Sequence, residues 1–318
     1  MAELAVVVLS YNTREVTTRC LRELFATSAE IDLQVVVVDN ASHDGSADAI
    51  AAEFPRARLL RNARNRGFAA AVNQAVSVTR APAILLLNSD CFLGPPAAAA
   101  TLLRTALDGL FSSPYVAALG VSVVTETGAR YVSARPFPTL RTYVTDKLHT
   151  GSPYPAAPAG GVWRGPVDVD WINGAFWLIA RRAWEEIGPL DERFFFGWED
   201  IDWCFAAHTR GWRVLHDPRL VVTHIGGESA RRRKDDVIVG HNLLLHTYLT
   251  GREKFWRKNY GWLSTVAMRG ASIAMSFPKW TLARARGDAS KAAVEWIRIA
   301  HALGIRDPGA PGERANAG

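Results

Sequence analysis

The sequence predicts an α/β fold in which helices flank a mostly parallel sheet, and two observations support it. Four short aliphatic runs are spaced along the first third of the chain. Stretches compatible with helices lie between these runs, so that strand and helix alternate. Because repeated βα units form parallel sheets with right-handed crossovers, we expect a Rossmann-like sheet followed by a C-terminal helical extension.

The first expected strand covers residues 5–9, an aliphatic run typical of a strand buried on both faces. A helix over residues 13–25 follows, because Val16, Cys20 and Leu24 lie on one helical face. The later elements rest on the same two patterns and on helix capping and ending residues. They are strands at 33–38, 58–61 and 84–87, a helix through Ile50 and Phe54 after capping residues at 42–45, and helices at 68–78, 93–110, 181–187 and 201–210.

The second half of the chain is less regular in pattern. Residues 134–168 are rich in Pro, Gly and aromatic residues, and we interpret them as a long loop over the site. From about residue 236 the chain becomes helical, basic and Trp-rich. The expected domains are 1–235, with halves at about 1–110 and 111–235, then a helical extension at 236–305 and a disordered tail at 306–318.

Composition limits the classes of function. The 318 residues are 48% hydrophobic, enough for one large α/β domain with an appendage. The net charge is +6, and the excess of Lys and Arg falls mainly after residue 230. Such a local basic surface suits anionic lipid or diphosphates. No nucleic-acid-binding motif is visible, so we expect no nucleic-acid partner.

The cysteines and the hydropathy pattern indicate a cytoplasmic location. The three cysteines are not arranged as CxxC, which favours a reduced chain. The N-terminus lacks the basic segment of a signal peptide. No apolar run reaches the roughly 18 residues that cross a bilayer, since the best candidate, 260–280, is interrupted by Arg269 and Pro278.

Polar residues follow three of the expected strands at the point where each strand ends. They are Tyr11-Asn12, Asp39-Asn40 and Asn88-Ser89-Asp90. Ligands of parallel sheets bind beyond the carboxyl ends of the strands. We therefore expect these three clusters to share one rim.

Asp39 is a candidate acceptor for the N3–H of a uracil or thymine ring. The alternative is a helix N-cap, but Ser42 or Asp44 is better placed for that role. Arg66, in the Asn65-Arg66-Gly67 turn, is a candidate phosphate ligand. An ordinary turn is the alternative there.

Asn88-Ser89-Asp90 is a candidate metal motif. A diphosphate with Mg²⁺ or Mn²⁺ needs few protein ligands, because phosphate oxygens and water complete the coordination. A strand-end turn explains the same residues equally well. His224, followed by Gly226 and Gly227, is a second candidate ligand, with a packed histidine as the alternative.

Glu199, Asp200 and Asp202 begin an expected helix, where acids also interact favourably with the helix dipole. The helix dipole does not explain the aromatic residues that precede them, including Trp198. Aromatic residues beside a carboxylate form a sugar platform and raise its pKa by desolvation. Asp200 is therefore our candidate catalytic base.

Two basic regions have both a functional and an ordinary interpretation. Arg231-Arg232-Arg233-Lys234 is either a mobile clamp on a diphosphate or a solvated face. The extension at 236–305 places Trp256, Tyr260 and Trp262 among Lys and Arg residues. Such helices lie in membrane interfaces, although packing against the catalytic domain or a homodimer partner explains them equally well.

These motifs, in this order, resemble family 2 inverting glycosyltransferases of the GT-A fold, and most closely the bacterial rhamnosyltransferase-type members. The resemblance covers residues 4–230 and rests on the joint order and spacing of the motifs. The motifs are Val-Leu-Ser-Tyr-Asn (8–12), Val-Asp-Asn-Ala-Ser-x-Asp-Gly-Ser (38–46), Asn-Arg-Gly-Phe-Ala (65–69), Leu-Asn-Ser-Asp (87–90), Asn-Gly-Ala-Phe (173–176), Asp-Glu-Arg-Phe-Phe (191–195), Glu-Asp-x-Asp (199–202) and His-x-Gly-Gly (224–227).

The resemblance implies roles for the matching residues. Nucleotide-sugar binding falls to Ser10, Tyr11, Asn12, Asp39, Asn65, Arg66, Gly67, Asn73, Asn88 and Ser89 in the first half, and acceptor binding to Asn173, Gly174, Trp198 and Asp202 in the second. Asp90 and His224 would hold Mn²⁺ or Mg²⁺, and Asn88 departs from the usual acid-x-acid motif. Asp200 would be the base, with Glu199 beside it. The Gln-x-x-Arg-Trp motif of processive members is absent, which implies transfer of one sugar per encounter.

The resemblance also implies the substrates. The first candidate donor is dTDP-L-rhamnose, and a UDP-hexose or galactofuranose donor is the second. The acceptor would be a glycan or a polyprenyl-diphosphate-linked sugar in cell-surface polysaccharide synthesis, which suggests peripheral contact with the inner face of the plasma membrane.

Two other classes of protein remain as alternatives. A dinucleotide-dependent dehydrogenase is disfavoured, because Ser10-Tyr11-Asn12 and not Gly-x-Gly-x-x-Gly follows the first strand. A catalytically inactive sugar-nucleotide-binding or scaffolding protein is the main non-enzyme alternative.

Overall fold

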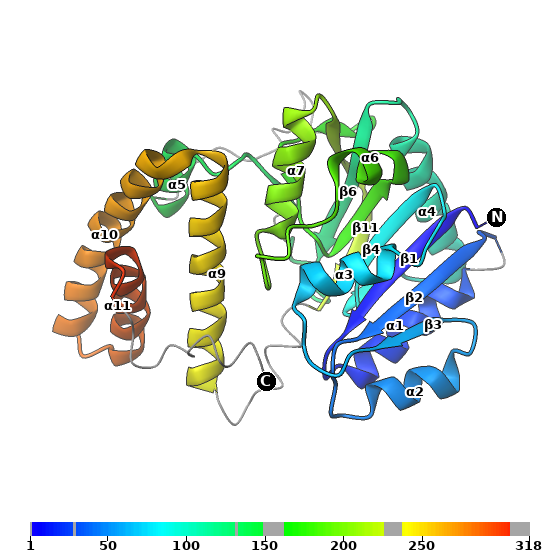
Figure 1. The fold of residues 1–318 in the computed structure, drawn as a ribbon, viewed down its shortest axis with the longest axis horizontal. Helices are drawn as coiled ribbons and strands as arrows, with labels where there is room; N and C mark the ends of the chain where they lie inside the picture. The colour runs from blue at the N-terminus through cyan, green and yellow to red at the C-terminus, as the bar shows by residue number, and fades with distance from the viewer. Residues whose placement is uncertain (1, 28–29, 131–132, 149–161, 226–236, 306–318) are drawn as a thin grey trace. The chain divides into compact units, whose positions relative to one another are not determined.

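A computed structural model describes residues 2–27, 30–130, 133–148, 162–225 and 237–305 of the chain. The first part contains the four parallel strands that the sequence predicts, and the structure places them in the order β3-β2-β1-β4. Figure 1 shows these strands side by side with helices along them. They are β1 (Leu4–Ser10), β2 (Leu33–Asp39), β3 (Arg58–Arg61) and β4 (Ala83–Asn88).

The sheet continues beyond β4 with further strands. β10 (Phe176–Ala180) lies antiparallel between β4 and β6 (Val116–Val124). β11 (Arg213–His224) is parallel to β6 and antiparallel to the short β5 (Cys91–Phe92). The result is the expected mostly parallel sheet with an antiparallel insertion. β10 begins at Phe176, which pairs with Leu87 near the carboxyl end of β4.

The helices of this part follow the apolar stripes of the sequence. α4 begins at Pro96 and not at 93, because Cys91 and Phe92 pair with β11 instead. α6 ends at Gly188, whose φ of +100° suits glycine. The set is α1 (Arg14–Ala26), α2 (Ser46–Glu53), α3 (Phe68–Val76), α4 (Pro96–Leu110), α6 (Arg181–Ile187) and α7 (Glu199–Thr209).

The start of α2 corrects one prediction. Its N-cap is Gly45, with a φ of +79°, and no side chain caps it. Ser42 instead accepts a hydrogen bond from the Asn12 N–H. Asp44 accepts from the Ser46 N–H at 3.0 Å, within the first turn. Ser42 therefore joins two loops and does not cap the helix, whereas Asp44 contacts the first residue of α2 from outside the N-cap position and also accepts from the Arg14 N–H.

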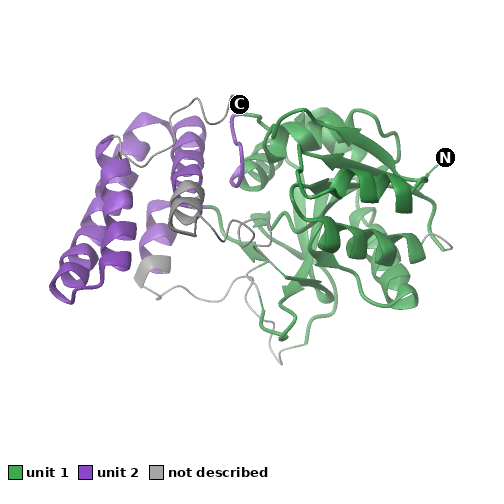
Figure 2. Cartoon of the chain, turned by 90° about the horizontal axis from the view of Figure 1, so that it is seen from below, with its two compact units in different colours: residues 1–137, 153–192, 199–232 green, residues 138–152, 193–198, 233–318 purple. Residues whose placement is uncertain are grey.

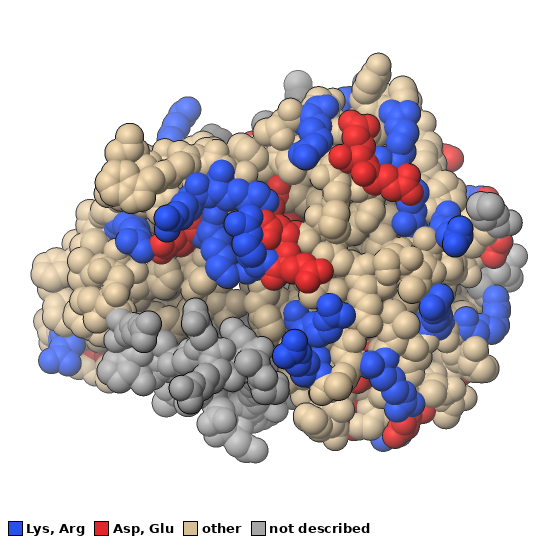
Figure 3. Space-filling model, in the orientation of Figure 1, with Lys and Arg blue, Asp and Glu red and all other residues tan. Residues whose placement is uncertain are grey.

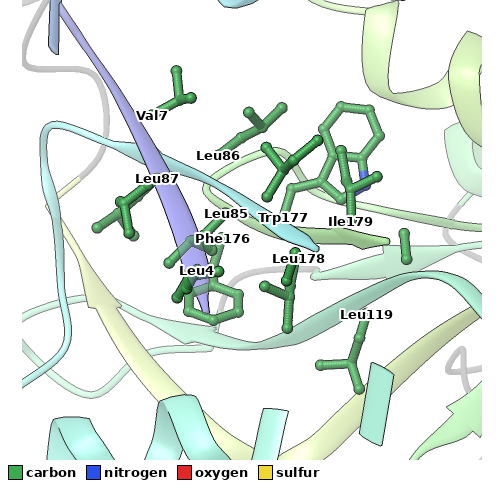
Figure 4. Close-up of a cluster of buried hydrophobic side chains, with 14 of the residues drawn as sticks. Leu4, Val7, Leu85, Leu86, Leu87, Leu119, Phe176, Trp177, Leu178 and Ile179 are labelled. Carbon is green, nitrogen blue, oxygen red and sulfur yellow. The ribbon is translucent and has the colours of Figure 1, made fainter. Parts of the chain in front are cut away.

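The core lies along β1, β4 and β10, where almost every side chain is buried. Figure 4 shows Leu85, Leu86 and Trp177 within this cluster. Trp177 is fully buried and meets the ring of Trp203 edge-on, with 5.5 Å between centroids. These contacts tie β10 to α7, which carries the acidic cluster.

The expected long loop at 134–168 is partly ordered, which corrects that prediction. β7 (Ala134–Arg135) pairs with β9 (Trp171–Ile172), and β8 (Val167–Asp168) pairs with β11. A helix, α5 (Leu140–Leu148), also lies within it. Residues 149–161 lie outside the described part of the chain.

The chain forms two compact units, coloured in Figure 2. Unit 1 comprises residues 1–137, 153–192 and 199–232 and holds the sheet. Unit 2 comprises residues 138–152, 193–198 and 233–318, so it includes two segments from upstream of the expected extension. It contains α5 together with α9 (Val237–Asn259), α10 (Gly261–Ala285) and α11 (Ala289–Leu303).

The helices of unit 2 pack against one another, with α10 in contact with α9, α11 and α5. None of the helices in the described ranges combines the length and the apolar character needed to cross a membrane. The expected disordered tail at 306–318 lies outside the described residues. The boundaries at 235 and 305 stay predictions.

Candidate active site

The loops after β1 and β2 are joined by hydrogen bonds. The Asn12 side-chain oxygen accepts from the His43 N–H at 2.8 Å, and the Asn12 N–H donates to Ser42 Oγ at 2.9 Å. Asn12 has a φ of +54°, a backbone conformation that asparagine tolerates better than most residues. Ser10 is buried and accepts from Thr17. These groups shape the rim, and the partly buried Tyr11 stands among them.

Asp39 ends β2 at the level of Ser10 on β1. It is 3% exposed, and its Oδ1 accepts from the Ser42 N–H at 3.0 Å. Its Oδ2 is buried and accepts no hydrogen bond from the residues that the structure describes. A buried acceptor without a donor costs about 1–3 kcal/mol. The second oxygen therefore suits a donor group supplied by a ligand.

Asn40 organises the loop that contains Asn65, Arg66 and Gly67. Its amide donates to Asn65 Oδ1 at 2.8 Å and accepts from the Arg66 N–H at 3.1 Å. Arg66 itself is exposed and donates to Gln74. The Asn65 oxygen also accepts from the Gly67 N–H, so the turn interpretation describes this residue well. Asn40 had no assigned role from the sequence, and only its hydrogen bonds reveal one.

Asn73 has a structural role that the sequence did not suggest. Its Oδ1 accepts from the Leu190 N–H at 2.9 Å, and its Nδ2 donates to the Leu190 carbonyl at 2.8 Å and to Glu192 at 3.1 Å. Both ends of the amide are thus used within the protein. This geometry does not support the prediction that Asn73 binds a nucleotide sugar; the residue holds the segment before the acidic cluster.

Asp90 and His224 meet at the edge of the sheet. Asp90 Oδ1 lies 2.9 Å from His224 Nε2, and Asn88 Nδ2 lies 3.4 Å from the same nitrogen. The pairing of His224 with Cys91 across β11 and β5 brings them together. The Ile225 N–H adds a hydrogen bond to the Asp90 carbonyl. The pairing of β5 with β11 therefore keeps Asp90 and His224 side by side, although they are far apart in the sequence.

Ser89, between Asn88 and Asp90, faces the loop after β1. Its Oγ lies 3.4 Å from Thr13 Oγ1, in a buried position. This contact joins the β4 end to the β1 end. The three clusters at the strand ends thus share one rim, as expected from the topology.

The Asp90–His224 pair fits a divalent cation. A carboxylate oxygen and an imidazole nitrogen suit Mn²⁺, and Mg²⁺ prefers oxygen ligands. Among the described residues no group of three or more His, Cys, Asp or Glu side chains is placed to hold a metal ion. The donor set therefore suits a cation whose remaining ligands are diphosphate oxygens and water.

Asp200 is the second residue of α7, and its carboxylate is held from two directions. The Ile201 N–H donates to Oδ1 at 2.8 Å, and the Gly174 N–H donates to the same carboxylate. Burial raises the pKa of Asp200 to about 6, although these hydrogen bonds oppose the shift. Glu199 and Asp202 are buried at 6% and 4% exposure. Asp200 is therefore ionised at neutral pH and more basic than an ordinary aspartate.

Residues 173–175 connect Asp200 to the end of β4. The Ala175 carbonyl accepts from the Asn88 N–H at 3.0 Å, and the preceding Gly174 donates to Asp200. Asn173 Oδ1 accepts from the Ala175 N–H at 2.8 Å and so shapes this turn. Gly174 was predicted to bind the acceptor, whereas its observed contact is with the candidate base. The antiparallel β10 creates this connection.

The aromatic residues before Glu199 differ in exposure. Phe194 is buried, and Phe196 is 55% exposed. Trp198 is 4% exposed and packs against Tyr248 and Phe255 of unit 2. A sugar platform at this position fits Phe196 better than Trp198, which was the predicted acceptor contact. Gly226 and Gly227, as well as the basic run at 231–234, lie outside the described residues.

This combination is the one expected of a transferase of the GT-A type. The structure presents a buried carboxylate with an unpaired oxygen, the adjacent Asp90 and His224 side chains, and an aspartate with a raised pKa. Residues 5–153 match the family Glycosyl transferase family 2. Residues 5–153 are therefore a family 2 glycosyltransferase domain, and the chain is similar in sequence to an L-rhamnosyltransferase.

Two known proteins share sequence with this chain. The N-acetylglucosaminyl-diphospho-decaprenol L-rhamnosyltransferase of Mycobacterium tuberculosis is 27% identical over 295 residues, which is 86% of this chain and 93% of that protein. The succinoglycan biosynthesis protein ExoO of Rhizobium meliloti is 34% identical over 90 residues, 28% of this chain and 26% of that protein.

One solved structure supports the fold. The mannosyltransferase PcManGT from Pyrobaculum calidifontis, in complex with GDP-Man and Mn²⁺, superposes with a TM-score of 0.54. The alignment covers 95% of this chain and 86% of that structure at 17% identity. At this identity the likeness establishes the GT-A fold alone.

Proposed function

We propose that this glycosyltransferase moves one sugar from a nucleoside-diphosphate donor to a hydroxyl group, with inversion, in cell-surface polysaccharide synthesis. The first candidate donor is dTDP-L-rhamnose, and the acceptor is a glycan or a polyprenyl-diphosphate-linked sugar. The observation that carries the proposal is the partly buried Asp200, whose pKa is raised to about 6, connected through Gly174 and Ala175 to the strand end of Asn88. The M. tuberculosis relative, named for rhamnose transfer to a lipid-linked acceptor, supports it.

Asp39 would recognise the base of the donor. Its unused Oδ2 accepts a hydrogen bond from the N3–H of thymine or uracil, whereas Oδ1 stays with Ser42. Tyr11, Ser10 and Asn12 line the same rim beside it. Arg66 is exposed, and its backbone N–H donates to Asn40, the residue after Asp39. Its guanidinium would bind a phosphate of the donor.

Asp90 Oδ1 and His224 Nε2 would hold Mn²⁺ or Mg²⁺ together with the diphosphate. When bound, the cation acts as a Lewis acid that stabilises the negative charge of the leaving diphosphate. The role of the chain is to keep the two ligand atoms adjacent. The β5–β11 pairing does this.

Asp200 would take the proton of the acceptor hydroxyl. The acceptor oxygen forms a bond to the anomeric carbon as the bond from that carbon to the diphosphate oxygen breaks, and the diphosphate keeps the electron pair. The proton moves to the Asp200 carboxylate, so no covalent enzyme intermediate is needed. The Gly174 and Ile201 N–H groups fix the carboxylate while it acts. General-base assistance of this kind contributes about 10²–10⁴-fold.

The first experiment measures the shift in melting temperature with dTDP-rhamnose, UDP-sugars and GDP-sugars, each with and without Mn²⁺. A shift that needs both the metal and a thymine or uracil nucleotide supports the proposal. A larger shift with a UDP-hexose or UDP-galactofuranose selects the alternative donor. No shift with any donor contradicts the metal–nucleotide site.

The same samples separate an enzyme from an inactive binder. A metal-dependent release of nucleoside diphosphate is expected from an enzyme. A melting shift without any release over hours, with acceptor lipid present, favours a catalytically inactive sugar-nucleotide-binding protein.

Unit 2 carries a surface that suits contact with an anionic membrane. α10 exposes several apolar side chains, and its Lys279 and Arg284 are also exposed. Figure 3 shows further Lys and Arg side chains gathered over the helices of unit 2. Aromatic and aliphatic side chains flanked by cations favour the interface of anionic bilayers. The exposed apolar residues are Trp262, Leu263, Val266, Phe277 and Leu282.

Vesicle flotation tests this contact. Co-flotation with phosphatidylglycerol vesicles, and its loss in a Trp262→Ser/Leu263→Ser variant, is expected. A concentration-dependent dimer that the same substitutions dissociate, with no flotation, would assign the surface to a homodimer instead.

A further inference from the structure

The residue before the acidic cluster has an unusual backbone conformation. Trp198 has a φ of +78°, directly after Gly197 with a φ of +79°. Glycine adopts such angles freely, but they are unfavourable for a bulky residue unless the surroundings hold it there. α7 begins at the next residue, Glu199. Contacts of the Trp198 side chain must therefore stabilise this backbone conformation at the residue before α7.

The indole of Trp198 is held by one face of α9. Its ring centroid lies 5.3 Å from that of Tyr248 and 5.5 Å from that of Phe255. The side chain is almost fully buried, and its Nε1–H donates no hydrogen bond to any described residue. The ring is thus fixed by packing within unit 2.

Gly251 makes this close approach to α9 possible. A methyl group on Gly251 would lie 2.8 Å from Cδ1 of Trp198 and 3.2 Å from the Gly197 carbonyl oxygen. The first distance is shorter than any normal carbon–carbon contact. Glycine in a helix interior is otherwise unfavourable. The absence of a side chain at residue 251 therefore allows the Trp198 ring to pack against α9.

The same face of α9 also contacts Arg193, the first residue of the segment 193–198 that precedes α7. Lys254 Nζ donates to the Arg193 carbonyl at 2.6 Å. Tyr248, Gly251 and Lys254 follow one another at intervals of three residues, so they share one side of the helix. Segment 193–198 belongs to unit 2, coloured purple in Figure 2, whereas residues 199–232 belong to unit 1.

We propose that Trp198 is a positioning residue for Asp200. Its indole, seated on Gly251 of α9, fixes the backbone from which α7 begins, and only Glu199 separates it from the carboxylate that meets the acceptor. The helical unit would thus take part in setting the base, in addition to any membrane contact. The inference rests on the proposed function of Asp200, and its tests separate the two.

The first test is Gly251→Ala, with Gly270→Ala as the matched control. Both are glycine-to-alanine changes within helices, but a methyl group at 270 meets nothing within 4 Å. The rate of dTDP release from dTDP-rhamnose with Mn²⁺ should fall about 10–100-fold in Gly251→Ala, because small misplacements of a catalytic group have effects of this size. The dissociation constant for dTDP and Mn²⁺ should stay unchanged. Equal rates in both variants would overturn the proposal.

Hydrogen–deuterium exchange provides a readout that does not need turnover. The Ile201 N–H is bonded to Asp200 Oδ1, so peptides covering residues 199–205 report on this geometry. Exchange there should be faster in Gly251→Ala and unchanged in Gly270→Ala, with α1 as the internal reference. If exchange changes but wild-type protein releases no dTDP, the positioning stands and the proposed donor fails. Unchanged exchange in Gly251→Ala contradicts the positioning itself.

A double-mutant cycle shows whether Gly251 acts through Trp198. In a Trp198→Ala background the methyl group at 251 has no ring to meet, so Gly251→Ala should cause no further loss of rate. Trp198→Gly relieves the backbone strain but removes the indole, and it should be as slow as Trp198→Ala. Additive losses, or full activity of Trp198→Gly, would show that the indole does not position the base.

Discussion

Asp90 Oδ1 lies 2.9 Å from His224 Nε2, although the two residues follow different strands in distant parts of the chain. The two-residue strand β5 makes this possible, because it pairs with the last residues of β11. Both side chains are mostly buried, with 12% and 15% exposure. The proposed function assigns the cation that accompanies the donor to this pair.

Removing either member of this pair should weaken metal binding. We expect Asp90→Asn and His224→Ala each to raise the Mn²⁺ dissociation constant, measured by electron paramagnetic resonance with dTDP present, by roughly tenfold or more, a change of about 1.4 kcal/mol. Asp48→Asn is the control, since this exposed carboxylate pairs with Arg61 at the surface. Unchanged Mn²⁺ affinity in both variants would remove the metal role from this pair.

Asp39 should determine the base preference of the donor site. Asp39→Asn keeps an acceptor for the Ser42 N–H but turns an NH₂ group toward the ligand, so that two donors would face each other. Titration calorimetry should show dTDP and UDP affinity falling by about tenfold or more. GDP serves as the comparison, because a loss shared equally by all three nucleotides would mean that Asp39 only supports the fold.

Asp200 should govern both the rate and its pH dependence. Asp200→Asn keeps one side-chain oxygen, which can still accept from the Ile201 N–H, but it cannot take a proton, so sugar transfer should fall about 10²–10⁴-fold with nucleotide binding intact. In the wild type, the rate should decline as the pH falls through about 6, where the carboxylate becomes protonated. A variant that retains the wild-type rate, or one that loses dTDP binding, would contradict the role of base.

The same carboxylate should reduce the stability of the wild type above neutral pH. Its native pKa of about 6 lies above the ordinary 3.8, so between these values the native state keeps a proton that the unfolded chain has released. Stability is therefore lost as the pH rises through this range, by about 2–3 kcal/mol when the shift is fully expressed. The Asp200→Asn variant has no carboxylate to ionise at this position, so its free energy of unfolding should not decrease in this way.

Urea unfolding measures the expected difference in stability. Asp200→Asn should be the more stable protein at pH 8, and the gain should disappear near pH 4. A gain of the same size at both values would indicate better packing and not relief from ionising a buried carboxylate.

Much of the first half of the fold could be read from the sequence. The aliphatic runs ending at Ser10, Asp39 and Asn88 are strands within one or two residues of the prediction. Burial on both faces leaves an unmistakable run of branched apolar residues, and the turn chemistry after each run marks its end. The rim of polar residues followed from topology alone.

The sequence did not reveal β10 or the role of Asn73. Phe176–Ala180 is as apolar as the other strands, but periodicity carries no information about which strand is its neighbour or in which direction it runs. The hydrogen bonds of Asn73 to Leu190 join residues far apart in the chain, and no local pattern signals such a contact.

By itself, the sequence determined the first four strands and most of the helices that flank them, the residues at their ends and the resemblance to a transferase family, because each depends on local pattern. The tertiary structure alone decided which of these residues meet. The Gly174–Asp200 contact exists because β10 enters the sheet beside β4, and the Asp90–His224 pair exists because β5 pairs with β11. These contacts depend on strand neighbours, which long-range packing selects among many arrangements that the same local pattern allows.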